Sequence, residues 1–399
     1  MKYQLPTLAT GLLLAFGPAA TAQRLTGQVL DAATSRPVPY ASISVLSTSL
    51  GTTSNAEGEF ELGGVALPGR LVVSELGHQR DTVAVATAGG PLQIRLRPAS
   101  VLLPEVQVGS YLGDLIAQAY RELRRTHDRK MYGQAFYRQI TYLDGDATEV
   151  QEMVWDAETS NAGVEGTSLA QGRFAKKKAL LSFNNFSVYT KGISLFDSKT
   201  DSSALRGLIG PNAARYFVLK LVGVAQNGPQ QLVEIDFASR PEFPANQERG
   251  NIVIDETTHQ ILRLRLEAPG FRTKSNSPLH KFKNESTQIE WVFVPRPNGA
   301  TTLDYLKVTR RASISRLSKV DVALAVSSFT FFYNGRPTPA ASVTYAPAKG
   351  GEVDLALIKQ TTYDPAFWQS NAVVKRTPLE EQVIKSFEQK GAFGTMLTP

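Results

Sequence analysis

The side chains that could hold a metal ion or act as acids and bases are few in this 399-residue sequence. Its four histidines are His78, His127, His259 and His280, and none begins the His-x-x-Glu motif expected of a catalytic zinc site. The nearest match is His78 followed by Asp81. Because this pair lies among short predicted strands, a structural role is favoured over a metal role. We therefore predict no metal site and no cofactor.

Motifs for nucleophilic catalysis and nucleotide binding are missing as well. The sequence contains no cysteine, which excludes thiolate catalysis and disulfides. The run Gly192-Ile193-Ser194-Leu195 lacks the second glycine of a Gly-x-Ser-x-Gly elbow, and the sequence contains neither a P-loop nor a dinucleotide fingerprint. We therefore predict no catalytic or cofactor-binding residue, and a protein that is not an enzyme.

One cluster of carboxylates keeps an enzymatic alternative open. Glu149, Glu152, Asp156 and Glu158 lie along one segment, and Glu152 could face Asp156 or Glu158 across a loop. A glycosidase needs two such groups at a set separation, which sequence spacing does not fix. Solvated carboxylates at a strand edge are the commoner explanation. A hydrolase that uses these carboxylates remains an alternative.

The stretch Leu25–Arg97 organises the N-terminal part of the chain. Short β-runs are separated by Gly, Pro and Asn at intervals of about 8–12 residues, which indicates a small antiparallel sandwich. Small or apolar residues alternate with serines in Ala41–Val45, as they do with glutamates in Glu59–Leu62. Asn55–Gly58 predicts a hairpin turn. Pro37–Pro39 belongs to an edge or a connection, because proline cannot donate to a central ladder.

Four motifs in this stretch occur in a recognisable order. They are Gly27-x-Val29-x-Asp31, Pro37-x-Pro39-x-Ala41-x-Ile43, Asn55-x-Glu57-Gly58-x-Phe60 and Ser74-x-x-Gly77-His78. This order resembles the carboxypeptidase-regulatory-like domain, a transthyretin-like β-sandwich. His78 replaces the aromatic residue that usually follows the last glycine. The resemblance implies a β-module over residues 23–98 that serves interactions, and does not imply peptidase activity.

The N-terminus predicts export. Lys2, the apolar run Leu12–Phe16 and the small residues Ala20-Thr21-Ala22 form a signal peptide over residues 1–22. We expect a periplasmic or outer-membrane-associated protein with no transmembrane helix in the mature chain. The net charge of +7 favours contact with anionic surfaces without requiring it, and export argues against nucleic acid as a partner.

Residues 99–130 are predicted to form a linker strand and one amphipathic helix. The run Leu103-Pro104-Glu105-Val106 resembles the segment that follows such sandwiches in outer-membrane proteins of Bacteroidetes-type bacteria, although too few residues follow for a TonB-dependent receptor barrel. Ser110 is the predicted N-cap. An apolar stripe runs from Leu112 to Leu123, and we expect it to cover the following sheet; a membrane-surface helix is the alternative.

Residues 131–399 are predicted to be β-rich. The expected strands are Gln134–Tyr142, Val150–Trp155, Tyr216–Val224, Gln231–Phe237, Asn251–Asp255, Gln260–Glu267, Gln288–Val294, Thr302–Thr309 and Ser327–Tyr333. Residues 156–214 predict long loops with a solvated turn at Lys176–Lys178 and a strand near Leu180–Tyr189. Leu262, Leu264 and Leu266 are predicted to share one face, in a hairpin that weakly resembles the lipoprotein-carrier half-barrel, a curved sheet around a helix or an apolar cavity.

The C-terminal part predicts an anchor and a capped helix. Tyr363–Trp368 places two aromatic residues after a proline-initiated turn, where they can anchor in the core. Thr377–Glu380 forms a capping box with proline at the first helical position. Leu379, Val383 and Phe387 form the predicted buried stripe, and Gly391 ends the helix. The chain closes in Thr398-Pro399, without the terminal aromatic of many outer-membrane barrels.

The fold prediction is therefore mainly β: an N-terminal antiparallel sandwich followed by a larger curved antiparallel sheet domain with few helices. We expect a non-enzymatic cell-envelope protein that binds a ligand or partner. Its expected partner is an outer-membrane or periplasmic protein, with a glycan or lipid as further candidates. A small outer-membrane β-barrel with a periplasmic sandwich is the second alternative, and the hydrolase is the third.

Overall fold

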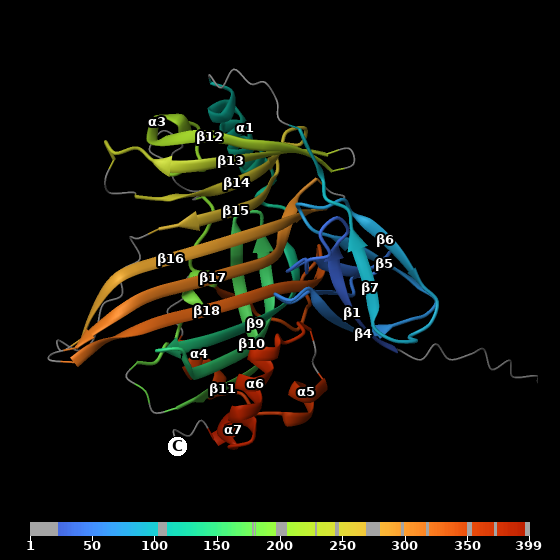
Figure 1. Cartoon of the computed structure of the whole chain (residues 1–399), viewed down its shortest axis with the longest axis vertical. Coiled ribbons are helices and arrows are strands. Elements are labelled where there is room, and N and C mark those ends of the chain that lie inside the picture. Colours follow the sequence, from blue (N-terminus) through green and yellow to red (C-terminus); the bar gives the residue numbers. More distant parts are fainter. Residues whose placement is uncertain are drawn as a thin grey trace, which may run out of the picture.

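The computed structural model describes residues 23–102, 110–177, 179, 181–196, 206–227, 230–243, 247–268, 280–296, 299–316, 319–348, 353–370 and 373–395. The predicted signal peptide, most of the linker run after Leu102 and the final Thr398-Pro399 lie outside these residues, as does the side chain of His280. The described chain is mainly β, as predicted, with a small sandwich beside a large curved sheet (Figure 1).

The sandwich consists of two sheets with the orders β4-β1-β7 and β3-β2-β5-β6. Its strands are β1 (Gln23–Asp31), β2 (Ser42–Val45), β3 (Gly51–Thr53), β4 (Glu59–Val65), β5 (Gly69–Ser74), β6 (Asp81–Val85) and β7 (Leu92–Leu96). The alternating residues Ile43, Phe60 and Leu62 are buried between the sheets, as their spacing predicts. The pairing of β1 with β7 is parallel, whereas the other pairs in the sandwich are antiparallel.

The turn at Asn55–Gly58 forms, but the hairpin prediction is wrong. The Gly58 amide donates to the Asn55 carbonyl at 3.0 Å, and Gly58 has φ +72°. A Cβ on Gly58 would lie 2.5 Å from the Val29 carbonyl oxygen, so only glycine fits here. The flanking strands β3 and β4 belong to different sheets, because β3 pairs with β2 and β4 pairs with β1. The turn therefore carries the chain across the sandwich.

The large sheet has twelve strands among the described residues, in the order β19-β11-β10-β9-β18-β17-β16-β15-β14-β13-β12-β8. These are β8 (Ser100–Leu102), β9 (Met131–Leu143), β10 (Asp146–Ser160), β11 (Gly163–Lys176), β12 (Phe217–Asn227), β13 (Gln230–Ser239), β14 (Arg249–Asp255), β15 (Ile261–Glu267), β16 (His280–Pro295), β17 (Thr301–Arg316), β18 (Lys319–Arg336) and β19 (Ala346–Pro347). Every pair of neighbours is antiparallel. Nine of the ten strands predicted for this part are present.

The main core lies on one face of this sheet and includes helix α1 (Tyr111–Thr126). The predicted stripe from Leu112 to Leu123 is buried there, so the helix covers the sheet. Ser110 is the residue before the helix, but its side chain makes no capping hydrogen bond, because its backbone is already helical. No helix in the described part of the chain is long and apolar enough to cross a membrane.

The prediction of long loops over residues 156–214 is wrong in its first part. Strand β10 continues to Ser160, and β11 occupies Gly163–Lys176, where glycines and polar residues mask the alternation of buried side chains. The predicted strand near Leu180–Tyr189 is also wrong. The described residues there form turns that lead into the short helix α2 (Val188–Lys191), and Phe186 enters the main core. A second short helix, α3 (Ala213–Tyr216), precedes β12.

Four short helices follow the last strand: α4 (Asp354–Ile358), α5 (Pro365–Ser370), α6 (Pro378–Glu388) and α7 (Ala392–Thr395). Helix α4 joins the main core, whereas the other three pack against the opposite face of the sheet near β9, β10 and β11 (Figure 1). The Thr377–Glu380 capping box is formed in full, and Trp368 is buried as the predicted anchor. The prediction for Leu379 is wrong: it is 58% exposed, and Ile384 takes its place in the buried stripe.

Candidate functional site

The sandwich packs on the sheet face opposite the main core. Its anchor is Tyr40, whose ring stacks on Phe329 at 5.1 Å and lies 5.5 Å from the ring of Tyr305. The Lys307 ammonium lies 4.7 Å from the centre of the Tyr40 ring and donates to the Tyr40 hydroxyl at 3.1 Å. Aromatic stacking and a cation over the ring together fix the sandwich against β17 and β18.

The segment 373–377 holds the sandwich from a second side. Val374 forms a parallel bridge with Thr53 of β3, and the Thr52 hydroxyl donates to the Val373 carbonyl at 2.6 Å. The Lys375 ammonium pairs with Glu59 at 3.0 Å. Because this segment follows the α5 anchor and precedes α6, the C-terminal part of the chain links the two β-bodies.

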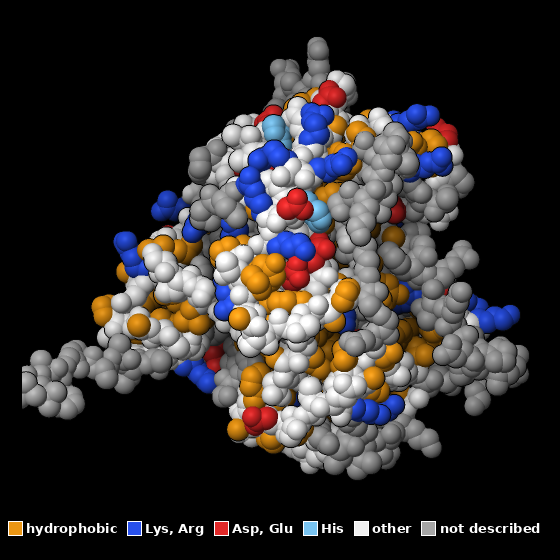
Figure 2. Space-filling model, turned by 180° about the vertical axis from the view of Figure 1, so that it is seen from behind, with side chains coloured by type: hydrophobic (Ala, Val, Ile, Leu, Met, Phe, Trp, Pro, Cys, Tyr) orange, Lys and Arg blue, Asp and Glu red, His pale blue; other side chains and the backbone are white. Residues whose placement is uncertain are grey.

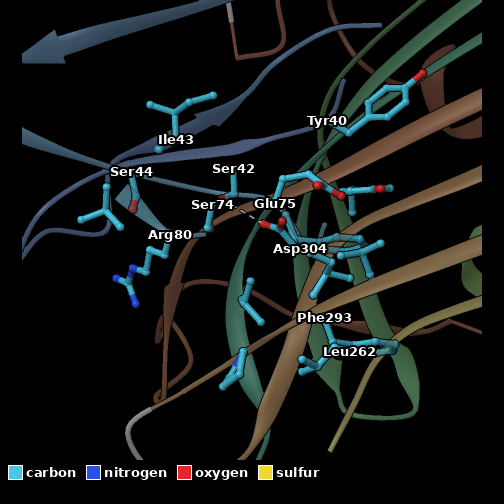
Figure 3. Close-up of a pocket in the computed structure, with 18 of the residues that line it drawn as sticks. Tyr40, Ser42, Ile43, Ser44, Ser74, Glu75, Arg80, Leu262, Phe293 and Asp304 are labelled. Carbon is cyan, nitrogen blue, oxygen red and sulfur yellow. Dashed lines mark hydrogen bonds between the residues drawn. The ribbon is translucent and has the colours of Figure 1, made fainter. Parts of the chain in front are cut away.

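A cavity of about 950 Å³ lies beside the Tyr40 anchor, between the sandwich and the sheet. Side chains of β2, β5 and the loop after β5 form its sandwich wall, and side chains of β15 to β18 form its sheet wall. Figure 3 shows Ser42, Ser74 and Asp304 gathered where the walls meet, with Leu262 and Phe293 on the sheet side. Ligand pockets of roughly 300–1,000 Å³ occur preferentially at such junctions.

Two β-bulges shape the sheet wall. The register of β16 against β17 shifts between Val292 and Phe293, which leaves Asp304 as an extra residue on β17. The register of β14 against β15 shifts in the same way and leaves Leu262 as the extra residue on β15. A bulge re-aims the side chain that it carries. Both extra residues line the cavity, whereas Leu303 and Ile261 beside them lie in the main core.

This arrangement corrects the prediction that Leu262, Leu264 and Leu266 share one face. Leu264 and Leu266 pack in the main core, but Leu262 packs with Leu232 and Val253 in a separate cluster. The bulge at Leu262 is the physical reason, because one inserted residue reverses the face of the side chains before it.

Asp304 is the most unusual group of the cavity wall. The residue is only 8% exposed, and burial raises the pKa of its carboxyl to about 6 despite the opposing charge of Arg296 and the bond from Ser42. Its one hydrogen bond among the described residues is a long one, 3.4 Å from the Ser42 hydroxyl. A buried carboxylate usually has several donors, so Asp304 retains acceptor capacity.

Arg296 supplies the matching donor. It lines the same cavity, and its Nε atom is buried with no hydrogen-bond partner among the described residues. Burial lowers the pKa of Arg296, and the Asp304 carboxylate opposes this effect. The two groups influence each other electrostatically but form no ion pair in the described part of the chain. An acceptor and a donor, both under-used, therefore border one cavity.

His78, weighed above for a metal role, is instead held by two carboxylates. Its Nδ1 atom lies 2.6 Å from Glu75, and its Nε2 atom lies 3.0 Å from Asp31 on β1. The bond to Glu75 raises the pKa of His78, burial opposes this, and the bond to Asp31 reinforces it. In the described residues, no group of three or more His, Asp or Glu side chains is placed to hold a metal ion.

Replacing His78 with glutamine should change how stability depends on pH. Because the folded-state pKa of His78 is raised, its contribution is fully present below the unfolded value of about 6.5 and is lost as pH rises through the folded value. At acidic pH we expect His78→Gln to lower the free energy of unfolding by about 1 kcal/mol or less, since the His78 side chain is partly exposed. Thermal melts from pH 5 to 8.5 test this; identical pH profiles for the variant and the parent would refute it.

The sequence allows Glu152 to face Asp156 or Glu158 across a loop. The structure shows that these carboxylates do not face each other in this way. All four lie on β10, and Glu152 and Asp156 are about 13 Å apart along the strand, beyond the roughly 6.5–9.5 Å of an inverting glycosidase. Nor are they all solvated edge groups: Glu149 and Glu152 are buried in the interior of the sheet. Glu158 pairs with Lys130 at 2.5 Å.

Glu152 has a structural environment. It lies directly opposite Arg138 of β9 and Arg173 of β11, and it accepts from their Nε atoms at 2.7 and 2.6 Å. Glu149 accepts from Ser182, Gln139 and the Phe183 amide, and burial raises its pKa despite these bonds. Through these hydrogen bonds the two carboxylates connect β10 to its neighbouring strands and to the loop at residues 182–183.

The comparison with protein families identifies the N-terminal body. The model of the CarboxypepD_reg-like domain matches residues 25–108. The sandwich is a CarboxypepD_reg-like domain. This confirms the resemblance drawn from the four motifs. The CarboxypepD_reg-like domain supplies Ser42, Ser74 and Tyr40 to the junction, whereas Asp304 and Arg296 come from the β-rich body beyond the matched residues.

No curated protein matches the chain at a significant level. Three solved structures are similar over part of it. A DUF1329 family protein from Desulfovibrio piger is 9% identical, with a TM-score of 0.25 over 59% of this chain and 94% of its own. A putative membrane-associated protein of unknown function from Bacteroides fragilis is 11% identical, with a TM-score of 0.16 over 79% and 98%. A LolA superfamily protein from Nitrosomonas europaea is 9% identical, with a TM-score of 0.18 over 54% and 92%.

Proposed function

We propose that this chain is an exported, non-enzymatic envelope protein that binds a ligand in the cavity between its CarboxypepD_reg-like domain and its large sheet. The observation that carries the proposal is the cavity of about 950 Å³ with walls from both bodies. Its wall contains buried polar groups whose bonding capacity is not used up, as in ligand sites. The signal-peptide pattern at residues 1–22 supports export.

The surface charge fits a binding protein of this kind. On the face opposite to that of Figure 1, lysine and arginine side chains are interspersed with acidic ones and do not merge into one patch (Figure 2). A protein that binds polyanions gathers its basic residues on one face. On this face, the described side chains therefore offer no broad basic field for a polyanion.

Fragment binding to a filled cavity tests the proposal. A fragment library is screened by ligand-observed NMR against the parent protein and against Ser44→Trp, which places an indole in the cavity. Gln93→Trp, at an exposed position of β7 in the other sheet of the sandwich, is the matched control. We expect a set of competing fragments whose binding is lost in Ser44→Trp and kept in Gln93→Trp. Absence of binding, or equal binding in both variants, contradicts the proposal.

The non-enzymatic part needs its own measurement. We expect purified protein to leave peptide, ester and glycoside libraries unchanged, because no recognisable nucleophile, acid–base pair or metal motif is present in the sequence. Sustained turnover that a single carboxylate substitution abolishes, such as Asp304→Ala or Asp156→Ala, would establish a hydrolase instead.

A further inference from the structure

The charged side chains around the cavity indicate the chemistry of the ligand. Glu75 and Asp304 contribute negative charge to the wall, and Arg80, Arg263 and Arg296 contribute positive charge. A strongly anionic ligand would be repelled by Glu75 and Asp304, and a strongly cationic ligand would be repelled by the three arginines. An acyl chain would leave Asp304 and Arg296 buried without partners, which is costly. The lining therefore selects a neutral, polar ligand.

The two under-used groups define what the ligand must offer. Asp304 has one long hydrogen bond, so its carboxylate needs donors. Arg296 has a buried Nε atom without a partner among the described residues, so its guanidinium needs acceptors. A hydroxyl group is both donor and acceptor. Two neighbouring hydroxyl groups can donate to Asp304 and accept from Arg296 at the same time.

The sandwich adds short hydroxyl side chains to the same place. Ser42 and Ser74 lie directly opposite each other on β2 and β5, and both line the cavity (Figure 3). Ser44 continues the row along β2. Ser42 and Ser44 alternate with the buried Ala41 and Ile43, so the polar face of β2 lies toward the cavity. They can bond hydroxyl groups in either direction.

Flat apolar surface completes the wall. Tyr333, which is partly exposed, lines the sheet side beside the buried Phe331 and Tyr305, and the rings of Phe331 and Tyr333 are parallel with centres 6.0 Å apart. Such rings offer contact area to the C–H faces of a sugar ring, while the polar groups bind its edges. From this combination we propose that the cavity binds a saccharide through a pair of neighbouring hydroxyl groups held between Asp304 and Arg296.

The test, which rests on the proposed function, uses defined sugars. Maltotetraose, cellotetraose and mannotetraose are titrated by calorimetry into the full protein, alongside their O-permethylated counterparts, which keep the ring shape but cannot donate. We expect at least one native sugar to bind and its permethylated form not to bind. Asp304→Asn and Arg296→Gln should each weaken binding by about tenfold or more, since each loses a charge-assisted hydrogen bond.

Matched variants and the fragment screen separate the ways in which this proposal can fail. Asp321→Asn and Arg125→Gln change the same groups at exposed positions and should bind as the parent does. Fragments that occupy the cavity while no sugar binds at millimolar concentration would overturn the saccharide proposal alone. Equal binding by Asp304→Asn, Arg296→Gln and the parent would also overturn it. Failure of every fragment and sugar would overturn the proposed function as well.

Discussion

Glu152→Gln is expected to destabilise the protein by about 3–5 kcal/mol, the usual cost of removing one partner from a buried ionic cluster. Glu152 is 1% exposed and is the shared partner of two buried arginines, Arg138 and Arg173. A neutral amide leaves both guanidinium groups without their nearest countercharge. Burial opposes ionisation of Glu152, yet Arg173 and Arg138 lower its pKa to about 2.

The cluster extends to the C-terminal helices, which is why the effect should be large. Arg138 and Arg173 also contact Glu380 and Glu388 of α6, at 3.3 and 3.1 Å. The Arg173 guanidinium lies over the ring of Trp368 at 4.7 Å and over that of Phe393 at 4.4 Å. The helices α5, α6 and α7 thus depend on the position of one guanidinium that Glu152 fixes.

Urea unfolding at neutral pH measures this cost, and Glu158→Gln is the control. Glu158 lies on the same strand but pairs with the partly exposed Lys130, so its loss should cost about 1 kcal/mol or less. The parent should also lose stability as pH falls from about 4.5 toward 2, because the folded-state pKa of Glu152 is depressed, and Glu152→Gln should lose this dependence. Similar unfolding midpoints for the two variants would contradict the argument.

The elements that can be predicted from the sequence are those whose alternation is strict. In β2 and in the first half of β4, up to Leu62, apolar residues recur at every second position, so the amino-acid pattern alone indicates strands of a sandwich. The strand β11 was missed because Gly163, Gly166 and Gly172 interrupt the apolar pattern. Its Arg173 is buried only because Glu152 and two aromatic rings surround it, and those contacts join residues that are distant in the sequence.

The candidate site escaped prediction for a related reason. Asp304 and Leu262 sit at bulges, where a strand departs from period two. A signal was present in both cases: Ile261 and Leu262 are adjacent apolar residues, and the buried positions Leu303 and Leu306 are three apart rather than two. Neither interruption of the alternating pattern predicts which part of the molecule the side chain will face. Only the placement of the sandwich against the sheet brings Ser42 to Asp304.

Asp304→Asn is expected to stabilise the protein at neutral pH by about 2–3 kcal/mol. Burial raises the pKa of Asp304 from 3.8 to about 6 in the folded state, so folding favours the protonated form. The folded state therefore binds more protons than the unfolded state between these values, and stability falls as pH rises through that window. Each unit of pKa corresponds to about 1.4 kcal/mol, and partial relaxation of the site reduces the sum.

Melting curves from pH 3.5 to 8 separate this effect from a change in packing. The parent should lose stability from about pH 4 to pH 6 relative to Asp304→Asn, and the two should converge below that window, where Asp304 is protonated in both states. Asp321→Asn, an exposed carboxylate exchange on β18, should leave the profile unchanged. A variant less stable than the parent at pH 7 would show that the carboxylate is satisfied by bonds of its own. A more stable Asp304→Asn would mean that the ionised Asp304 carboxylate lowers the stability of the parent. Such a cost in stability is expected of a residue that is retained for binding.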